Sequence, residues 1–503
     1  MNRKKKLAIN TMASLIKQFV SIICAFILPR LFLTHYGSEV NGLVSSITQF
    51  LGLISIFDAG MGVVIEASLY KPLAQKNSIL INQVLSSGQS FYRKFVALLA
   101  IYTIILACIF PFLPGNNFDF FYIFTLVLAI SISSFGQYGI GVTNSVLLSA
   151  DQKSYLNFAA YAITNIVNTI LGVVLINLNC SVQVVKLASS LVFLIRPLFL
   201  AYYVKKHYLV NWHEKYTEEP IKQKWNGFAQ HIAALVVANT DIVVLTVFST
   251  LRNVSIYSVY FLVINSIKEI VNASSAGIKS LIGDMLAKKE ILKLENTFSF
   301  LEWSMHIFIV FLFSMTATLI VPFIMIYTRG VNDANYNVPT FAILLSIAYA
   351  IYCLRIPYFT VIQAAGHFKE TQKSSIIEAL INIVVSVVTV FHFGLIGVAC
   401  GTIVAMTYRL LYLVWYLSRN IIQRSMKLFY KQMCADVLIF AIVINLTKII
   451  ELRELSYLSW IITIGPKAFL AMTVILVINL ILYNRQMISF CKNIKVWIKK
   501  KNY

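Results

Sequence analysis

Acidic residues are scarce in this 503-residue chain. Asp and Glu number 20 against 42 Lys and Arg, and charged residues are only 12% of the whole. No gap between the apolar stretches is long enough to hold a soluble domain, and the mean hydropathy is +0.78. An ordinary soluble protein is therefore excluded, and we predict an all-α integral membrane protein. Most of the net charge of +22 flanks apolar stretches and would face anionic lipid, so no nucleic acid is expected.

Several chemical signatures are also missing. The seven cysteines include no CxxC pair, which argues against a zinc site and against a disulfide framework. There is no GxxxxGKS/T phosphate loop, no HExxH and no nucleophile elbow. We therefore expect no ATPase, no other enzyme, no cofactor and no metal. The short gaps also leave no domain that could polymerise a substrate.

Long apolar stretches, in contrast, follow one another along nearly the whole chain. Fourteen of them are long enough to cross a hydrocarbon core of roughly 30 Å as a helix. The predicted spans are 7–34, 40–67, 95–114, 119–146, 155–177, 181–204, 227–250, 254–277, 298–327, 340–364, 374–393, 395–417, 433–450 and 459–483.

Basic residues occupy alternate gaps between these spans. Thirty Lys and Arg lie at the N-terminus, in every second gap and in the tail, whereas the opposite gaps hold only Arg252, Arg329 and Arg453. By the positive-inside rule, we expect both termini and the longest gap to be cytoplasmic. An even number of spans agrees with that topology.

A weak internal repeat relates the two halves of the chain. The clearest match is between Arg196 and Tyr203 in one predicted span and Arg409 and Tyr416 in another, at a constant offset of 213 residues. Parallel repeats of this kind place the substrate site between the halves, near the middle of the membrane. The predicted divisions are a six-helix lobe 1–204, a cytoplasmic linker 205–226, a six-helix lobe 227–417, and two further helices with a basic tail in 418–503.

Charged residues within the spans need a physical reason, because a charge at the bilayer centre costs roughly 2.5–3.5 kcal/mol on insertion scales. Lys17, Lys268 and Arg355 are expected near mid-depth on different helices. Cations so placed suit a water-filled cavity that binds a pyrophosphate, with a structural role as the equal alternative. Asp241 could be their counter-ion or a protonatable coupling site, and the sequence leaves both open.

Other residues within the spans indicate structural roles. Arg196 and Arg409 are predicted to anchor equivalent interfaces in the two halves. Gly397 and Gly401 form a GxxxG, which predicts close packing of helices. Four acidic residues nearer the inner surface are expected to cap helix ends or to pair with loop lysines, namely Asp58, Glu66, Glu378 and Asp436.

The first two spans carry a resemblance to a known family. Its residues are Asn10, the stretch 29–43 (PRLFLTHYGSEVNGL) and the stretch 57–62 (FDAGMG). In these segments, and in helix count, repeat and loop lengths, the chain resembles the polysaccharide-export branch of the multidrug/oligosaccharidyl-lipid/polysaccharide flippase superfamily. The resemblance implies two parallel six-helix lobes like those of the multidrug exporters, two extra C-terminal helices, a V-shaped cavity and alternating access.

The same resemblance implies a function in the bacterial cytoplasmic membrane. The cargo would be an undecaprenyl-pyrophosphate-linked oligosaccharide, moved from the inner to the outer leaflet for capsule, O-antigen or exopolysaccharide synthesis. Membrane lipids, and the polymerase and glycosyltransferases of the pathway, are the other partners it suggests. Three alternatives stay open: a cation-coupled multidrug exporter, a lipid II flippase, and a scaffold without transport. Related lipid II flippases carry basic residues on helices 1, 2 and 8; Lys17 and Lys268 match the first and last, whereas helix 2 here has only acids.

Overall fold

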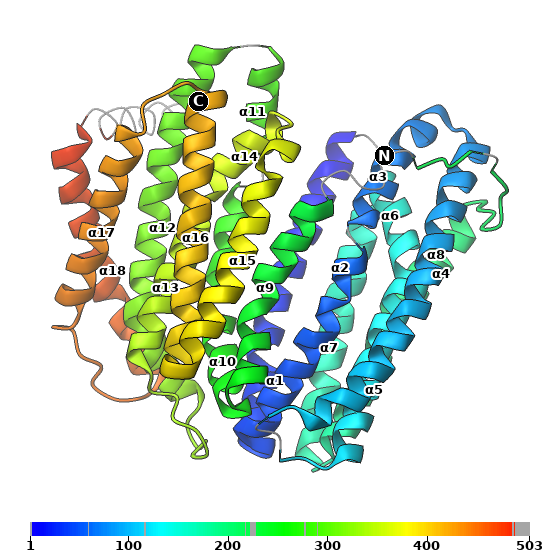
Figure 1. Ribbon diagram of the computed structural model, residues 1–503, viewed down its shortest axis with the longest axis horizontal. Helices are drawn as coiled ribbons and strands as arrows, with labels where there is room; N and C mark the ends of the chain where they lie inside the picture. The colour runs from blue at the N-terminus through cyan, green and yellow to red at the C-terminus, as the bar shows by residue number, and fades with distance from the viewer. Residues whose placement is uncertain are drawn as a thin grey trace. The chain divides into compact units, whose positions relative to one another are not determined.

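The protein is predominantly helical in the residues that the computed structural model describes, which are 3–58, 60–114, 117–216, 218–221, 228–275, 278–288, 290–484 and 487. No strand occurs in this described part, and long helices run side by side within each part of the chain (Figure 1). The predicted all-α fold is confirmed. Residues 217 and 222–226 of the predicted linker, and most of the predicted basic tail, lie outside the described residues.

The helices contain most of each predicted span, but some extend well beyond it: one begins at Ser78, 17 residues before the predicted span 95–114. They are α1 (Arg3–Leu53), α2 (Ser55–Asp58), α3 (Met61–Gln75), α4 (Ser78–Ile109), α5 (Phe120–Gly136), α6 (Val142–Ala150), α7 (Ser154–Asn177), α8 (Val182–His207), α9 (Phe228–Phe248), α10 (Leu251–Ser275), α11 (Ile278–Ala287), α12 (Ile291–Tyr327), α13 (Pro339–Leu354), α14 (Ile356–Ala364), α15 (Phe368–Phe393), α16 (Leu395–Asn420), α17 (Lys427–Thr447) and α18 (Tyr457–Leu482). A 3₁₀ turn, Phe110–Phe112, follows α4, and a π-helical turn, Gln137–Gly141, joins α5 to α6.

Thirteen helical segments of the described chain are long and apolar enough to cross a membrane, as expected of a multi-pass membrane protein. The first, Ala8–Asp58, has 51 residues. At 1.5 Å per residue it would be about 77 Å long, more than twice the thickness of a hydrocarbon core. It is interrupted at Gly37 (φ 82°, ψ 175°), between the predicted spans 7–34 and 40–67. The total of fourteen spans stays a prediction.

The interruption at Gly37 has a local cause. Its φ lies in the region that side chains disfavour, and a Cβ there would stand 2.8 Å from Asp333 Oδ2. Asp333 accepts hydrogen bonds from the backbone N and from Oγ of Ser38, both 2.6 Å long. The carboxylate therefore caps the first turn of the second half of α1. The N–H groups of a first turn have no acceptor within their own helix.

Two other predicted spans contain breaks that a hydropathy pattern does not show. The span 340–364 divides at Arg355 into α13 and α14, where Pro357 near the start of α14 lacks an N–H. The span 119–146 contains the π turn, whose Gly139 carbonyl accepts a 3.0 Å hydrogen bond from Nε2 of Gln89 on α4. At the π turn, a side chain thus stabilises a backbone carbonyl that a regular helix would have paired.

The GxxxG prediction is confirmed. A Cβ at Gly397 would lie 2.4 Å from the carbonyl oxygen of Thr389, and one at Gly401 would lie 2.1 Å from Ser386 Oγ. The backbones of α15 and α16 approach too closely here to admit larger side chains.

The described chain forms two compact units. Unit 1 comprises Met1–Ser258 with the short segment Gly330–Ala334, and unit 2 comprises Val259–Arg329 with Asn335–Tyr503. Unit 1 therefore contains α9 and the first residues of α10 together with the N-terminal helices. In unit 2, α17 and α18 pack on α12 through a buried cluster that includes Val310, Val443 and Ile475. The lobes 1–204 and 227–417 stay a proposal about the repeat.

Candidate functional site: two clusters of cations and aromatic rings

The first cluster lies in unit 1, where two cations share one ring. The Lys17 Nζ, from α1, is 4.8 Å from the ring centre of Tyr161 on α7 and 5.8 Å from that of Phe158. The Arg196 guanidinium, from α8, is 5.2 Å from the same Tyr161 ring, and its Nε donates a 2.8 Å hydrogen bond to Asn157 Oδ1. Cation–π contacts of this kind contribute from about 0.5 to about 2 kcal/mol, the more so where water is excluded.

In the part of the chain that the structure describes, this cluster has no carboxylate beside it. Within the described residues, Lys17 and Arg196 contact aromatic rings and a neutral amide, and neither forms an ion pair. Two positive charges at membrane depth without a counter-ion form a site that attracts an anion.

The second cluster lies in unit 2 and also centres on a tyrosine. The Lys268 Nζ, from α10, is 5.6 Å from the Tyr352 ring centre and 3.7 Å from Glu269 Oε1. The Arg355 guanidinium, at the junction of α13 and α14, is 4.1 Å from the same ring. The structure thus brings Lys268 and Arg355 together, while Lys17 belongs to the other unit.

Glu378 links Arg355 to a second arginine. Its Oε1 pairs with Nη1 of Arg355, and its Oε2 lies 3.6 Å from Nε of Arg409. Arg409 also donates to the Thr371 carbonyl oxygen at 3.0 Å and to Ser374. The prediction that Glu378 caps a helix or pairs with a loop lysine is wrong: it is 5% exposed on α15 and pairs with the buried Arg409 and the half-buried Arg355. Three cations and two carboxylates leave this cluster with one excess positive charge.

Arg196 and Arg409 make equivalent contacts, as their place in the repeat suggests. Each reaches back to the start of the preceding helix: Arg196 to Asn157, 39 residues earlier, and Arg409 to Thr371, 38 residues earlier. The two sites differ in charge, because a carboxylate lies only beside Arg409.

Asp241 occupies a buried position on α9 in unit 1, where it is 4% exposed. Its Oδ2 accepts a 2.7 Å hydrogen bond from the hydroxyl of Tyr257 on α10. Lys268 and Arg355, its predicted partners, lie in unit 2. A role for Asp241 in coupling or as a counter-ion stays a hypothesis.

A buried polar network joins the C-terminal helices of unit 2. Arg424 pairs with both oxygens of Glu302, which also accepts a 2.5 Å bond from the Tyr358 hydroxyl. His306 lies 3.3 Å from that hydroxyl, and its Nδ1 is 2.5 Å from Asp436 Oδ2. The expectation that Asp436 caps a helix or meets a loop lysine is therefore wrong. The network fastens α17 to α12 and α14, and its signals in the sequence are the titratable residues Glu302, His306 and Asp436 inside predicted spans.

A polar seam runs along the second half of α1 in unit 1. The Arg252 guanidinium lies 2.9 Å from Glu39, Asn41 donates to Ser255 at 2.8 Å, and the hydroxyls of Ser46 and Thr246 are 2.7 Å apart. A Cβ at Gly42 would lie 1.8 Å from the Leu251 carbonyl oxygen, so the backbones touch. We call these contacts, with the bond from Gln49 to Asn239, the α1 seam. It joins a helix of the predicted first lobe to α9 and α10 of the predicted second lobe.

Several of these residues escaped the sequence reasoning. Nothing in the sequence distinguishes Tyr161 and Tyr352 from the other tyrosines of the 26. Lys467, 8% exposed on α18, could have been found, because it is a lysine within an apolar run like the others.

The arrangement of these helices is similar to that of several solved membrane transporters. Among solved structures, the lipid II flippase MurJ in an inward closed conformation aligns with a TM-score of 0.71 and 16% identity, covering 94% of this chain and 99% of that chain. An inward-facing multidrug resistance MATE family transporter of the MOP superfamily aligns with a TM-score of 0.63 and 14% identity, covering 81% and 98%. A MOP superfamily transporter from Pyrococcus furiosus aligns with a TM-score of 0.59 and 14% identity, covering 84% and 98%.

These identities show a shared fold, the MurJ and MATE fold, and nothing finer. No family profile matches the sequence. No curated protein sequence matches it either.

Proposed function

We propose that this protein is a flippase for lipid-linked oligosaccharides. It moves polyprenyl-pyrophosphate-linked repeat units from the inner to the outer leaflet of a bacterial cytoplasmic membrane, with both termini in the cytoplasm. The fold supports transport, since its structural neighbours are flippases and exporters. The glycosyltransferases that would build the glycan and the polymerase that would use it are the protein partners of this proposal.

One observation carries the choice of an anionic cargo. Lys17 and Arg196 meet at Tyr161 without a carboxylate, in helices that would lie within the membrane. A pyrophosphate supplies the missing negative charge, and charge-assisted hydrogen bonds recover the free energy of desolvating both partners. The second cluster has one excess positive charge. Its Lys268 and Arg355 are the other proposed ligands of the pyrophosphate.

The α1 seam supports alternating access as the mechanism. Its contacts are small, polar and mostly between neutral groups, so they can part without leaving buried unpaired charge. We propose that the seam closes the outer side of the transport path and opens when cargo leaves.

The test is transport of a labelled polyprenyl-pyrophosphate glycan by the purified protein in liposomes. Lys17→Ala and Lys268→Ala should each lower the rate at least about tenfold, the effect of losing one charge-assisted bond of about 1.5–3 kcal/mol. Lys17→Arg should keep part of the activity, since the charge is retained. The matched control is Lys448→Ala, at an exposed lysine that follows α17 and donates to Asn445, and this variant should transport normally. Normal transport by all the cluster variants would overturn the proposal.

A cation-coupled multidrug exporter is the second candidate, and buried Asp241 favours it. In such an exporter a carboxylate that binds and releases a cation couples transport to a gradient. Asp241→Asn should then abolish the dependence of transport on pH or sodium while cargo still binds. If Asp241 is a fixed counter-ion, the same change should leave that dependence intact and destabilise the protein. Transport across a pH and sodium series separates the two.

A further inference from the structure

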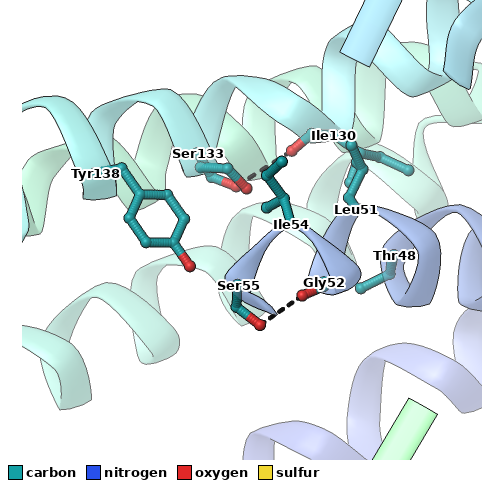
Figure 2. A pocket seen from close by; sticks show the side chains of 9 residues that line it. Thr48, Leu51, Gly52, Ile54, Ser55, Ile130, Ser133 and Tyr138 are labelled. Carbon is teal, nitrogen blue, oxygen red and sulfur yellow. Dashed lines mark hydrogen bonds between the residues drawn. The ribbon is translucent and has the colours of Figure 1, made fainter. Parts of the chain in front are cut away.

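A separate cavity in unit 1 is lined by hydroxyl groups. It has a volume of about 310 Å³ and lies where the end of α1 and α2 face α5 and the π turn. Figure 2 shows side chains from these segments pointing toward a common space, with Tyr138 reaching toward Ser55. Its hydroxyls belong to Thr48, Ser55, Ser133, Ser134 and Tyr138.

The cavity has no charged lining residue, and its hydroxyls differ in what they can still bind. Thr48 donates its hydrogen to the Val44 carbonyl of its own helix at 2.7 Å, Ser55 of α2 donates to the Gly52 carbonyl of α1 at 2.7 Å, and Ser133 donates to a carbonyl of α5 at 3.2 Å. Their oxygens therefore remain available as acceptors. Within the described chain, Ser134 and Tyr138 make no side-chain hydrogen bond, so both can donate to a ligand.

The wall that carries Tyr138 is held in place from behind. Its ring packs 4.6 Å from the ring centre of Phe95 and 6.4 Å from that of Tyr92. Gln89 bonds the Gly139 carbonyl of the π turn and in turn accepts a 2.7 Å bond from Thr143. Interruptions of this kind often occur at functional sites, and this one is fixed by side chains before any ligand arrives.

We propose that this cavity is a subsite for an uncharged sugar ring of the cargo. A sugar presents hydroxyls that both donate and accept, which matches a lining of donors and acceptors without charge. The volume is at the lower end of the range for small-molecule sites, roughly 300–1,000 Å³, and so suits a small group. The inference rests on the proposed function, because the sugar is delivered on a lipid-linked pyrophosphate whose phosphates bind at the cation clusters. In this proposal the cations bind the phosphates, and the cavity binds the sugar.

The experiment compares two probes on the full-length protein in nanodiscs. One is polyprenyl pyrophosphate, and the other is the same lipid carrying one N-acetylglucosamine. The pocket variant is Ser134→Ala with Tyr138→Phe, which removes the two free donors and keeps the ring. The control variant is Ser68→Ala with Tyr202→Phe, which removes two hydroxyls outside the cavity.

The wild type should bind the glycosylated lipid more tightly than the bare lipid. In the pocket variant the glycosylated lipid should bind about tenfold more weakly, the loss expected from two neutral hydrogen bonds, while the bare lipid binds as before. The control variant should bind both lipids as the wild type does. An equal loss for both lipids, no loss for either, or a wild type indifferent to the sugar would overturn the subsite. Each of those results leaves pyrophosphate binding standing, whereas a wild type that binds neither lipid overturns the proposed function itself.

Discussion

The carboxylate of Asp333 holds both the backbone N and the hydroxyl of Ser38, each at 2.6 Å. The two residues are 295 positions apart, and the two hydrogen bonds cap the helix that begins after the interruption of α1 at Gly37. A loop residue between α12 and α13 thus acts as the cap of a helix near the start of the chain.

Replacing Asp333 by Ala should therefore destabilise unit 1. Loss of a helix cap costs about 1 kcal/mol, within a range of roughly 0.5–2 kcal/mol. The midpoint of thermal unfolding in detergent should fall by a few degrees. Asp333→Asn keeps one hydrogen-bond acceptor, so it should lower the midpoint less. Equal midpoints for the wild type and Asp333→Ala would mean that the cap contributes no stability.

The α1 seam makes a prediction about opening. Ser46 is fully buried, so a cysteine placed there in a cysteine-free background should react slowly with a thiol reagent. Arg252→Glu puts a carboxylate beside Glu39 and should raise the labelling rate about two- to fivefold, since a partly exposed ion pair contributes roughly 0.2–1 kcal/mol. Exchanging both charges, with Glu39→Arg added, should restore slow labelling. A double variant that labels as fast as the single one would show that the pair does not hold the seam closed.

The two repeat-related arginines should differ in their effect on stability. Arg409→Ala leaves Glu378 buried with one arginine instead of two, and we expect a loss of about 3 kcal/mol of unfolding free energy. Arg196→Ala loses a contact with an amide and a ring, about 1 kcal/mol. Adding Glu378→Gln should recover part of the loss in Arg409→Ala. Chemical unfolding in detergent measures all of these, with the exposed Arg419→Ala as the control; equal losses at the two arginines would contradict the charge argument.

A pH dependence follows from Asp151, in the turn between α6 and α7. Burial opposes ionisation of this carboxyl, but hydrogen bonds from Lys153 (2.8 Å) and Tyr208 (2.5 Å) more than offset it, so its pKa lies below the usual value. The stabilisation is therefore complete above the unfolded-state pKa of about 4 and is lost as the pH falls through the lower folded-state value. The wild type should melt at a higher temperature than Asp151→Asn at pH 7. That difference should shrink below about pH 4, and a difference that grew on acidification would contradict the sign.

The proposed topology can be tested at two exposed residues. A cysteine at Asn335, in the loop before α13, should react with an impermeant reagent added to intact cells, and one at Lys215, in the long loop after α8, should not. Lysed cells should label both. Labelling of Lys215→Cys in intact cells would reverse or refute the orientation.

The helices could be predicted from the sequence because long apolar runs have few alternatives within a membrane. The ends of the helices and the breaks within them are harder to predict. The predicted loop between spans 7–34 and 40–67 shrinks to Gly37 alone, because its cap comes from Asp333. The contact partners of buried charged residues are harder still to predict. Glu378 is expected from the sequence to cap a helix end or to pair with a loop lysine, yet in the fold it meets Arg355, at the junction of α13 and α14, and Arg409 of α16. The sequence pattern predicts how deep in the membrane a residue lies, but it does not predict the direction in which the side chain points.

The short segment Gly330–Ala334 belongs to unit 1, although the chain on both of its sides belongs to unit 2. Asp333 stands six residues beyond the last residue of α12, Tyr327, and six before the first residue of α13, Pro339. Fully extended, each arm reaches roughly 20–22 Å. While the Asp333 carboxylate stays hydrogen-bonded to Ser38, the length of the loop limits how far the ends of α12 and α13 can lie from this bonded pair. Any rearrangement that carries the ends of α12 and α13 farther than that from Ser38 has to release the carboxylate first.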